Sequence, residues 1–208
     1  MPSRSFNGEL IKVARTRSEQ YPEIRENILK CAATVFAKTG YASSTITDIA
    51  TATGLSRGAL YHYFTSKEAI LCGILSQHVL EFLGKVEEAM RSSEVAVEQL
   101  SAITEAIVSV NSRSPNEQII LLSEINELPD REREMMEKVE RKILDLLSSL
   151  LVRVDVRGKI TRANKRVYTM MYLGIINYTF TWYDPNGKVT PAEYAELATD
   201  LFLKGLLS

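Results

Sequence analysis

Residues 45–64, TITDIATATGLSRGALYHYF, contain the pattern that decides the fold. A helix-turn-helix needs a small residue where its helices cross, a glycine four residues later for the turn, and an aliphatic residue six positions further on for the core. Ala50, Gly54 and Leu60 meet this spacing. The stretch therefore predicts two short helices at a fixed angle, the geometry that presents the second helix to the major groove of DNA.

Capping residues mark the ends of these two helices. Thr45 and Asp48 resemble a capping box in which Asp replaces the usual Glu, so the first helix begins there and Gly54 ends it. Ser56 is a natural N-cap for the second helix, which is expected at residues 57–64.

The second helix keeps a polar face once Leu60 and Phe64 are assigned to the core. Arg57 can donate two hydrogen bonds to guanine, a contact worth about 1–3 kcal/mol of discrimination. Gly58 favours close approach of the backbone to DNA, with a tolerated glycine in a frayed first turn as the alternative. Ala59 can touch a thymine methyl group. Phosphate contacts are expected from a further set, with solvated surface as the alternative for each: Thr45, Thr47, Tyr61, Tyr63 and Lys67.

Helical periodicity continues on both sides of the motif. An apolar stripe from Ile24 to Phe36, with Pro22 in the first turn and Gly40 after the last, predicts a preceding helix. Later helices are expected at 66–91, 94–111, 116–127, 130–154, 162–183 and 190–206. No strand-like alternation separates them, so the sequence predicts an all-α fold of about nine helices, ending in one antiparallel bundle.

Charge is divided unevenly along the chain. Residues 1–70 carry nine Lys and Arg against six Asp and Glu, and the remainder carries sixteen against twenty, which gives +3 and −4. A positively charged N-terminal part suits a surface that faces phosphates. Four basic residues before Pro22 can reach a minor groove, with a solvated tail as the alternative: Arg4, Lys12, Arg15 and Arg17.

Cysteine usage and the first residues indicate a cytoplasmic protein without a metal or other cofactor. Cys31 and Cys72 have no partner at metal-ligand spacing, so buried free thiols are expected. Residues 1–20 mix charges and contain no apolar leader. Residues 167–183 are uncharged, but their Thr and Asn side chains favour a buried helix over a membrane span.

The motif resembles the signature of the TetR/AcrR family, G-x-L-Y-x-[HY]-F-x-[SN]-K-E, which here reads GALYHYFTSKE at residues 58–68. The likeness covers residues 24–74. It implies an all-α homodimer with an inducer pocket and a dimer interface in its C-terminal helices. Ser56 starts the second helix, and the resemblance implies base contacts by Thr47, Arg57, Gly58 and Ala59 and phosphate contacts by Thr45, Tyr61, His62, Tyr63 and Lys67.

The resemblance also implies a division of the chain. We expect a basic arm at residues 1–21, a three-helix helix-turn-helix domain at 22–66, and a ligand-binding and dimerisation domain at 67–208. Dimer contacts would come from the helices near 162–183 and 190–206, where the apolar stripes contain Tyr168, Met171, Tyr172, Ile175, Leu197, Leu201, Phe202 and Leu206.

A small-molecule effector is expected in the helical body. Candidate pocket residues, with simple core as the alternative for each, are His78, Phe82, Leu121, Met135, Tyr172, Tyr178 and Trp182. The ending from Trp182 is similar to a subgroup associated with fatty-acid, steroid or aromatic catabolism. A nearby basic cluster opposes only Asp155 and can hold coenzyme A phosphates, with a solvated loop as the alternative: Arg153, Arg157, Lys159, Arg162, Lys165 and Arg166.

The sequence thus predicts a repressor that binds double-stranded, near-palindromic operator DNA and is released by a hydrophobic or acyl-coenzyme A effector. A drug-like or aromatic effector is the alternative. An activator or an architectural DNA-binding protein without an inducer would share this fold. An enzyme is disfavoured because the chain contains no phosphate-binding loop, no H-E-x-x-H zinc motif and no G-x-S-x-G nucleophile motif.

Overall fold

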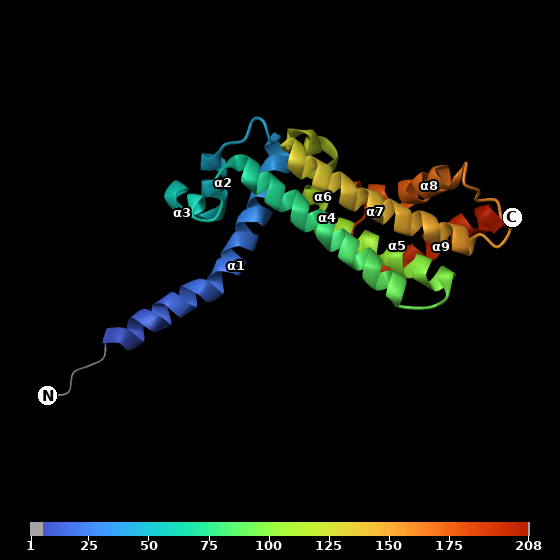
Figure 1. Cartoon of the computed structure of the whole chain (residues 1–208), viewed down its shortest axis with the longest axis horizontal. Coiled ribbons are helices and arrows are strands. Elements are labelled where there is room, and N and C mark those ends of the chain that lie inside the picture. The colour runs from blue at the N-terminus through green and yellow to red at the C-terminus, as the bar shows by residue number, and fades with distance from the viewer. Residues whose placement is uncertain (1–5, 208) are drawn as a thin grey trace. The chain divides into compact units, whose positions relative to one another are not determined.

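A computed structural model describes residues 6–207, and the side chains of residues 20–206. Within these residues it contains nine α-helices, two short 3₁₀ helices and no strand, which confirms the all-α prediction (Figure 1). The helices are α1 Phe6–Thr39, α2 Ile46–Thr53, α3 Arg57–Tyr61, α4 Lys67–Arg91, α5 Ala96–Arg113, α6 Pro115–Glu124, η1 Ile125–Glu127, α7 Asp130–Val154, α8 Lys165–Asn177, η2 Tyr178–Thr181 and α9 Pro191–Leu207.

Helix α4 contributes to both of the compact units into which the chain divides. The division falls between Ile74 and Leu75, inside this helix, whereas the sequence analysis placed it at residues 66/67. The first two turns of α4 belong to the N-terminal unit because Ile70 and Leu71 are fully buried in it. The core of that unit further contains Ile28 and Phe36 from α1, and residues of α2 and α3.

The expectation that the first helix begins at Pro22 is wrong, because α1 begins at Phe6 and passes through Pro22. A proline inside a helix lacks one N–H group and so removes one backbone hydrogen bond. The residues before it include many good helix formers, which accounts for the continuation of the helix. The side chains of Arg4, Lys12, Arg15 and Arg17 lie outside the described residues.

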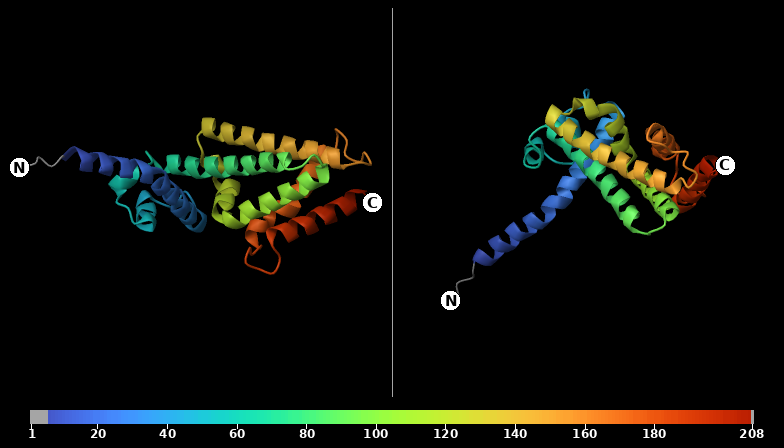
Figure 2. Two further views of the ribbon diagram at one scale, coloured as in Figure 1. Left: turned by 90° about the horizontal axis from the view of Figure 1, so that it is seen from below. Right: turned by 45° about the vertical axis from the view of Figure 1, so that its right-hand side comes forward.

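Helix α5 is central in the C-terminal unit, where it packs against α7, α8 and α9 (Figure 2). Its Leu100, Ile103 and Ile107 belong to the core cluster together with residues of α7 and α8. Three buried hydroxyl groups meet in this core. The Thr104 hydroxyl is hydrogen-bonded to the Tyr172 hydroxyl and lies 3.3 Å from the Thr199 hydroxyl. These contacts fix α8 and α9 on α5.

Helix α8 is shorter than the helix expected at 162–183. The buried side-chain amide of Asn111, on α5, donates hydrogen bonds of 3.3 Å to the carbonyls of Ile176 and Asn177. Because these carbonyls are bound by another helix, the chain continues beyond Asn177 as a 3₁₀ turn, η2.

Helix α4 is the one helix in the described part of the chain whose length and composition would suit a membrane span. Core helices pass the same test, and Val79, Val86 and Ala89 of α4 are buried inside the C-terminal unit.

Candidate DNA-binding surface and effector cavity

Local hydrogen bonds fix both ends of α2. The Thr45 N–H donates to the Asp48 carboxylate at 2.8 Å, and the Asp48 N–H donates to the Thr45 hydroxyl at 3.2 Å, so the predicted capping box is present. The same bonds from Thr45 lower the pKa of Asp48. Gly54 ends the helix at φ 70°, a left-handed conformation that glycine adopts without a steric penalty.

Helix α3 is a short helix with one buried and one exposed side. The Ser56 hydroxyl accepts a hydrogen bond from the Ala59 N–H at 3.1 Å and so caps the helix as predicted. Leu60 is 0% exposed and Phe64 is 5% exposed, which confirms their assignment to the core. Their burial leaves the opposite side of α3 in contact with solvent.

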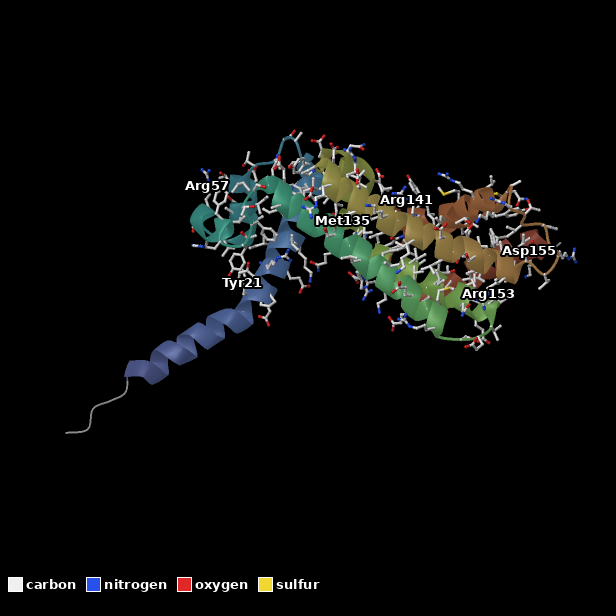
Figure 3. All side chains as sticks on the ribbon, in the orientation of Figure 1. Tyr21, Arg57, Met135, Arg141, Arg153 and Asp155 are labelled. Atoms are coloured by element: carbon white, nitrogen blue, oxygen red, sulfur yellow. The ribbon has the colours of Figure 1, made fainter. Side chains whose placement is uncertain are left out.

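The residues expected to contact DNA lie at the start of α2, on and directly around α3, and at the first position of α4. Arg57 begins α3 and projects away from the ribbon (Figure 3). Seven of the ten are exposed, namely Thr45, Thr47, Ser56, Arg57, Gly58, Tyr61 and His62, whereas Ala59, Tyr63 and Lys67 are half-buried. The structure therefore supplies a polar surface on a rigidly capped motif, as major-groove binding requires.

Lys67 has an intramolecular role that the sequence did not indicate. Its ammonium group donates to the carbonyls of Tyr41 and Ser44, at 2.7 and 2.9 Å, and lies 4.2 Å from the centre of the Tyr41 ring. Lys67 thus holds the loop that leads into the Thr45 cap. A phosphate contact by Lys67 stays a prediction.

Helix α1 contacts two aromatic residues that follow α3. Tyr21 stacks on Tyr63 with 4.7 Å between the ring centres, and the Arg25 guanidinium lies 4.9 Å from the centre of the Phe64 ring. Such contacts restrict the orientation of both aromatic rings.

The C-terminal unit contains a cavity of about 190 Å³ between α4, α6, α7 and α8. Its apolar lining consists of Val79, Phe82, Leu121, Ile143, Leu144, Met170 and Leu173, and its polar lining of His78, Gln118, Glu140 and Asn177. An apolar wall with a few polar groups is typical of small-molecule sites. His78, Phe82 and Leu121 were identified from the sequence.

Four other predicted pocket residues do not line this cavity. Tyr172 is completely buried in the core, where its hydroxyl contacts Thr104. Met135, Tyr178 and Trp182 are more than half exposed. Tyr178 begins the 3₁₀ turn and Trp182 follows it, so neither keeps the residue spacing of an α-helix that the prediction assumed.

The polar groups of the cavity differ in their partners. His78 Nε2 lies 2.9 Å from the Gln118 side-chain oxygen, and both residues are buried. The Asn177 side-chain oxygen is buried and has no hydrogen-bond partner among the described residues. Burial, and then the charge of Glu137, raise the pKa of Glu140. Glu140 was missed, although its spacing from Met136 and Ile143 places it on the buried stripe of α7.

Helices α8 and α9 also carry large apolar side chains that are exposed. Met171, Leu197 and Leu201, from the predicted dimer stripes, are more than half exposed, and so are Val167 and Met170. Tyr172, Phe202 and Leu206 instead face the core. Exposed apolar residues gathered on adjacent helices are typical of protein interfaces.

Comparisons with known proteins agree with this arrangement. The sequence model of bacterial regulatory proteins of the tetR family matches residues 28–72, and that of the tetracyclin repressor-like C-terminal domain matches residues 93–206. The HTH-type transcriptional repressor KstR2 of Rhodococcus jostii is 28% identical over 88% of this chain and 91% of its own length.

Two solved structures show the same fold. A TetR-family transcriptional regulator from Bordetella parapertussis is 32% identical, with a TM-score of 0.82 over 88% of this chain and 96% of that one. AibR, solved with isovaleryl coenzyme A and operator DNA, is 24% identical, with a TM-score of 0.72 over 86% of this chain and 97% of that one.

A capped helix-turn-helix joined to a helical bundle of this kind defines a class of DNA-binding transcription regulators. The class is divided into families by the bundle as well as by the motif. This chain belongs to the TetR family of bacterial regulatory proteins. Regulators of this family bind operator DNA and ligands as dimers.

The role of Lys67 can be tested by stability. Lys67→Met should lower the free energy of unfolding by about 1–2 kcal/mol, because the carbonyls of two buried residues lose their donor while helix propensity is kept. Urea denaturation followed by circular dichroism measures the change. Lys138→Met, at an exposed position of α7, is the control and should stay within about 0.5 kcal/mol of the parent. Equal stability of Lys67→Met and the parent would contradict the assignment.

Proposed function

We propose that the protein is a repressor whose dimer binds operator DNA through α3 and is released when an effector occupies the cavity of the C-terminal unit. The observation that carries this proposal is the exposed polar side of α3, headed by Arg57 and fixed by the buried Leu60. Catalysis is not part of the proposed role, and the cytoplasm, where operator DNA lies, is the proposed location.

Base and phosphate contacts would divide between the two sides of the motif. Arg57, Gly58 and Ala59 begin α3 and, with Thr47, would face base edges in the major groove. Thr45, Tyr61, His62, Tyr63 and Lys67 would contact phosphates, which fix the register of the protein on DNA without reading its sequence. Two such motifs in a dimer require an operator with two half-sites.

The dimer would form through α8 and α9. Their exposed apolar residues, above all Met171, Leu197 and Leu201, would be buried against the same helices of the second subunit. Acidic and basic side chains flank this face, such as Lys204 and Asp200 in an ion pair on α9. An apolar centre with a charged rim is the usual composition of a stable homodimer interface.

Effector binding would change the spacing of the two α3 helices. Helix α4 supplies His78, Val79 and Phe82 to the cavity and continues without a break from the N-terminal unit. A ligand that prefers a shifted α4 would favour the conformation with the lower operator affinity. AibR was solved with isovaleryl coenzyme A, so coenzyme A thioesters are the first class to test, before drug-like or aromatic compounds.

An activator or an architectural protein with this fold would give other results. An architectural protein would keep its DNA affinity at every effector concentration, and an activator would raise transcription from the bound promoter. Transcription in vitro, with and without the protein, separates both from a repressor.

Arg57→Ala should weaken operator binding by about 1–3 kcal/mol, roughly five- to 150-fold, because the guanine contact is lost. The measurement is fluorescence anisotropy on a duplex selected from random DNA by the parent protein. Arg131→Ala, at an exposed position of α7, is the control that should bind normally. The proposal is overturned if Arg57→Ala retains full affinity.

Leu121→Trp should fill the cavity and reduce binding of the apolar dye anilinonaphthalene sulfonate by about tenfold, since small pockets discriminate strongly against added volume. Operator binding should be unchanged. Leu122→Trp is a matched control, because Leu122 is the next residue, is 64% exposed and does not line the cavity. Equal dye binding by both variants would exclude this cavity as the ligand site.

Leu197→Glu combined with Leu201→Glu should convert the dimer into a monomer, because two carboxylates would be buried in the interface without partners. Light scattering should report a mass near 23.4 kDa instead of twice that value. The control carries Leu80→Glu, at a position of α4 that is also more than half exposed. A double variant that remains dimeric would show that the interface lies elsewhere.

A further inference from the structure

A groove of about 420 Å³ runs between α7 and α8 and contains three basic side chains. Arg141 comes from α7, and Lys165 and Arg166 come from the first turn of α8. Figure 3 shows Arg141 projecting from α7 on the side where α8 lies. Asp145 is the one acidic residue of the lining, so the groove has an excess of positive charge.

Unlike two of the basic residues on α7, these three cations form no ion pair among the described residues. Arg133 is paired with Asp130, and Lys142 with Glu87. In the described part of the chain, no carboxylate lies within ion-pair distance of Arg141, Lys165 or Arg166. Unpaired basic side chains from two helices that meet in one groove form a surface that attracts a multiply charged anion.

The groove and the apolar cavity are adjacent, because Leu144 and Met170 line both. Ser148, a buried residue of α7, adds a hydroxyl group to the lining of the groove. An apolar space next to a cationic groove fits a ligand with an apolar chain at one end and phosphates at the other.

Glu140 limits which chemical group the apolar end of the ligand can carry. It lines the cavity with a carboxyl group whose pKa is raised by burial. The burial that disfavours the charged form of Glu140 also disfavours a free carboxylate on a ligand in the same cavity, whereas a thioester is neutral. The cavity, at about 190 Å³, is smaller than the roughly 300–1,000 Å³ of drug-sized sites, so a short chain fits best.

We propose that the cavity and the groove together bind a short-chain acyl coenzyme A, with the acyl group among the apolar residues and the phosphates on Arg141, Lys165 and Arg166. Arginine can bind phosphate through two parallel hydrogen bonds, and lysine adds a point charge. This inference names a chemical class for the effector of the proposed function. It rests on the proposed function for the claim that the ligand regulates operator binding. Arg153, in the last turn of α7, is not assigned to the phosphates, since it donates a hydrogen bond of 2.9 Å to the side-chain oxygen of Gln99.

Calorimetric titration of the full-length protein tests the proposal with ligands that share one acyl group. Butyryl coenzyme A should bind at least about tenfold more tightly than S-butyryl-N-acetylcysteamine, which has the thioester without phosphates, and than butyrate. Its affinity should fall as salt is added. A butyryl lysophosphatidate separates a nucleotide head from a lipid head, and binding equal to that of butyryl coenzyme A would contradict the nucleotide assignment.

Charge-reversal variants test where the phosphates of coenzyme A bind. Arg141→Glu with Arg166→Glu should weaken butyryl coenzyme A by about tenfold or more and leave S-butyryl-N-acetylcysteamine unchanged. Arg131→Glu with Lys138→Glu changes the net charge equally at exposed positions of α7 outside the groove and should bind normally. If the first pair does not fold, Arg141→Gln with Arg166→Gln replaces it, with the same expectation.

Three results would overturn the inference: equal affinity for the two thioesters, no loss in the groove variant, or an equal loss in the control. Operator binding is measured separately. If butyryl coenzyme A binds as expected but leaves operator affinity unchanged, the proposed release from DNA is rejected and the ligand site is retained. If no thioester binds but Arg57→Ala still weakens DNA binding, the proposal of a DNA-binding regulator is retained and the acyl coenzyme A site is rejected.

Discussion

The burial of Leu60 is the constraint on which the candidate DNA-binding surface depends. Helix α3 has only five residues, and a helix of that length is not stable in water without tertiary contacts. Leu60 is completely buried and Ser56 caps the first turn, so one side chain and one hydroxyl fix the rotation of the helix. The direction of Arg57 and Tyr61 follows from this rotation, because residues on a helix keep fixed angles to one another.

The basic side chains fall into two groups: some stabilise the fold, and others are candidates for contacts with DNA or a ligand. Lys67 binds two carbonyls and Lys142 binds a carboxylate, so both stabilise the protein itself. Arg57 and Arg141 form no ion pair among the described residues, so both are candidates for contacts with another molecule. Sequence alone cannot make this distinction, because Lys67 and Arg57 occur in the same motif and carry the same charge.

Local features of the fold could be predicted and distant ones could not. The Thr45 and Asp48 capping box, the Gly54 turn and the burial of Leu60 depend on residues within a few positions, so spacing was sufficient. The shortening of α8 depends on Asn111, more than sixty residues away, and no local pattern indicates it. The start of α1 was missed because proline was interpreted as a helix start.

The candidate ligand site shows the same limit. His78, Phe82 and Leu121 were found because apolar stripes of α4 and α6 predict an interior, whereas Tyr178 and Trp182 were placed there by continuing α8 too far. Arg141 was not grouped with Lys165 and Arg166, because the sequence separates them and only the packing of α7 on α8 brings them to one groove.

The Asn111 amide has a mechanical consequence for the cavity. It ties the carbonyl of Asn177, a lining residue, to the central helix α5, and a further bond of 3.2 Å reaches the Thr179 hydroxyl. A wall anchored in this way resists displacement more than walls held by apolar packing alone, so an incoming molecule would push α4 or α6 aside first. The subunits of a dimer built on α8 would then stay joined while the rest of each body yields.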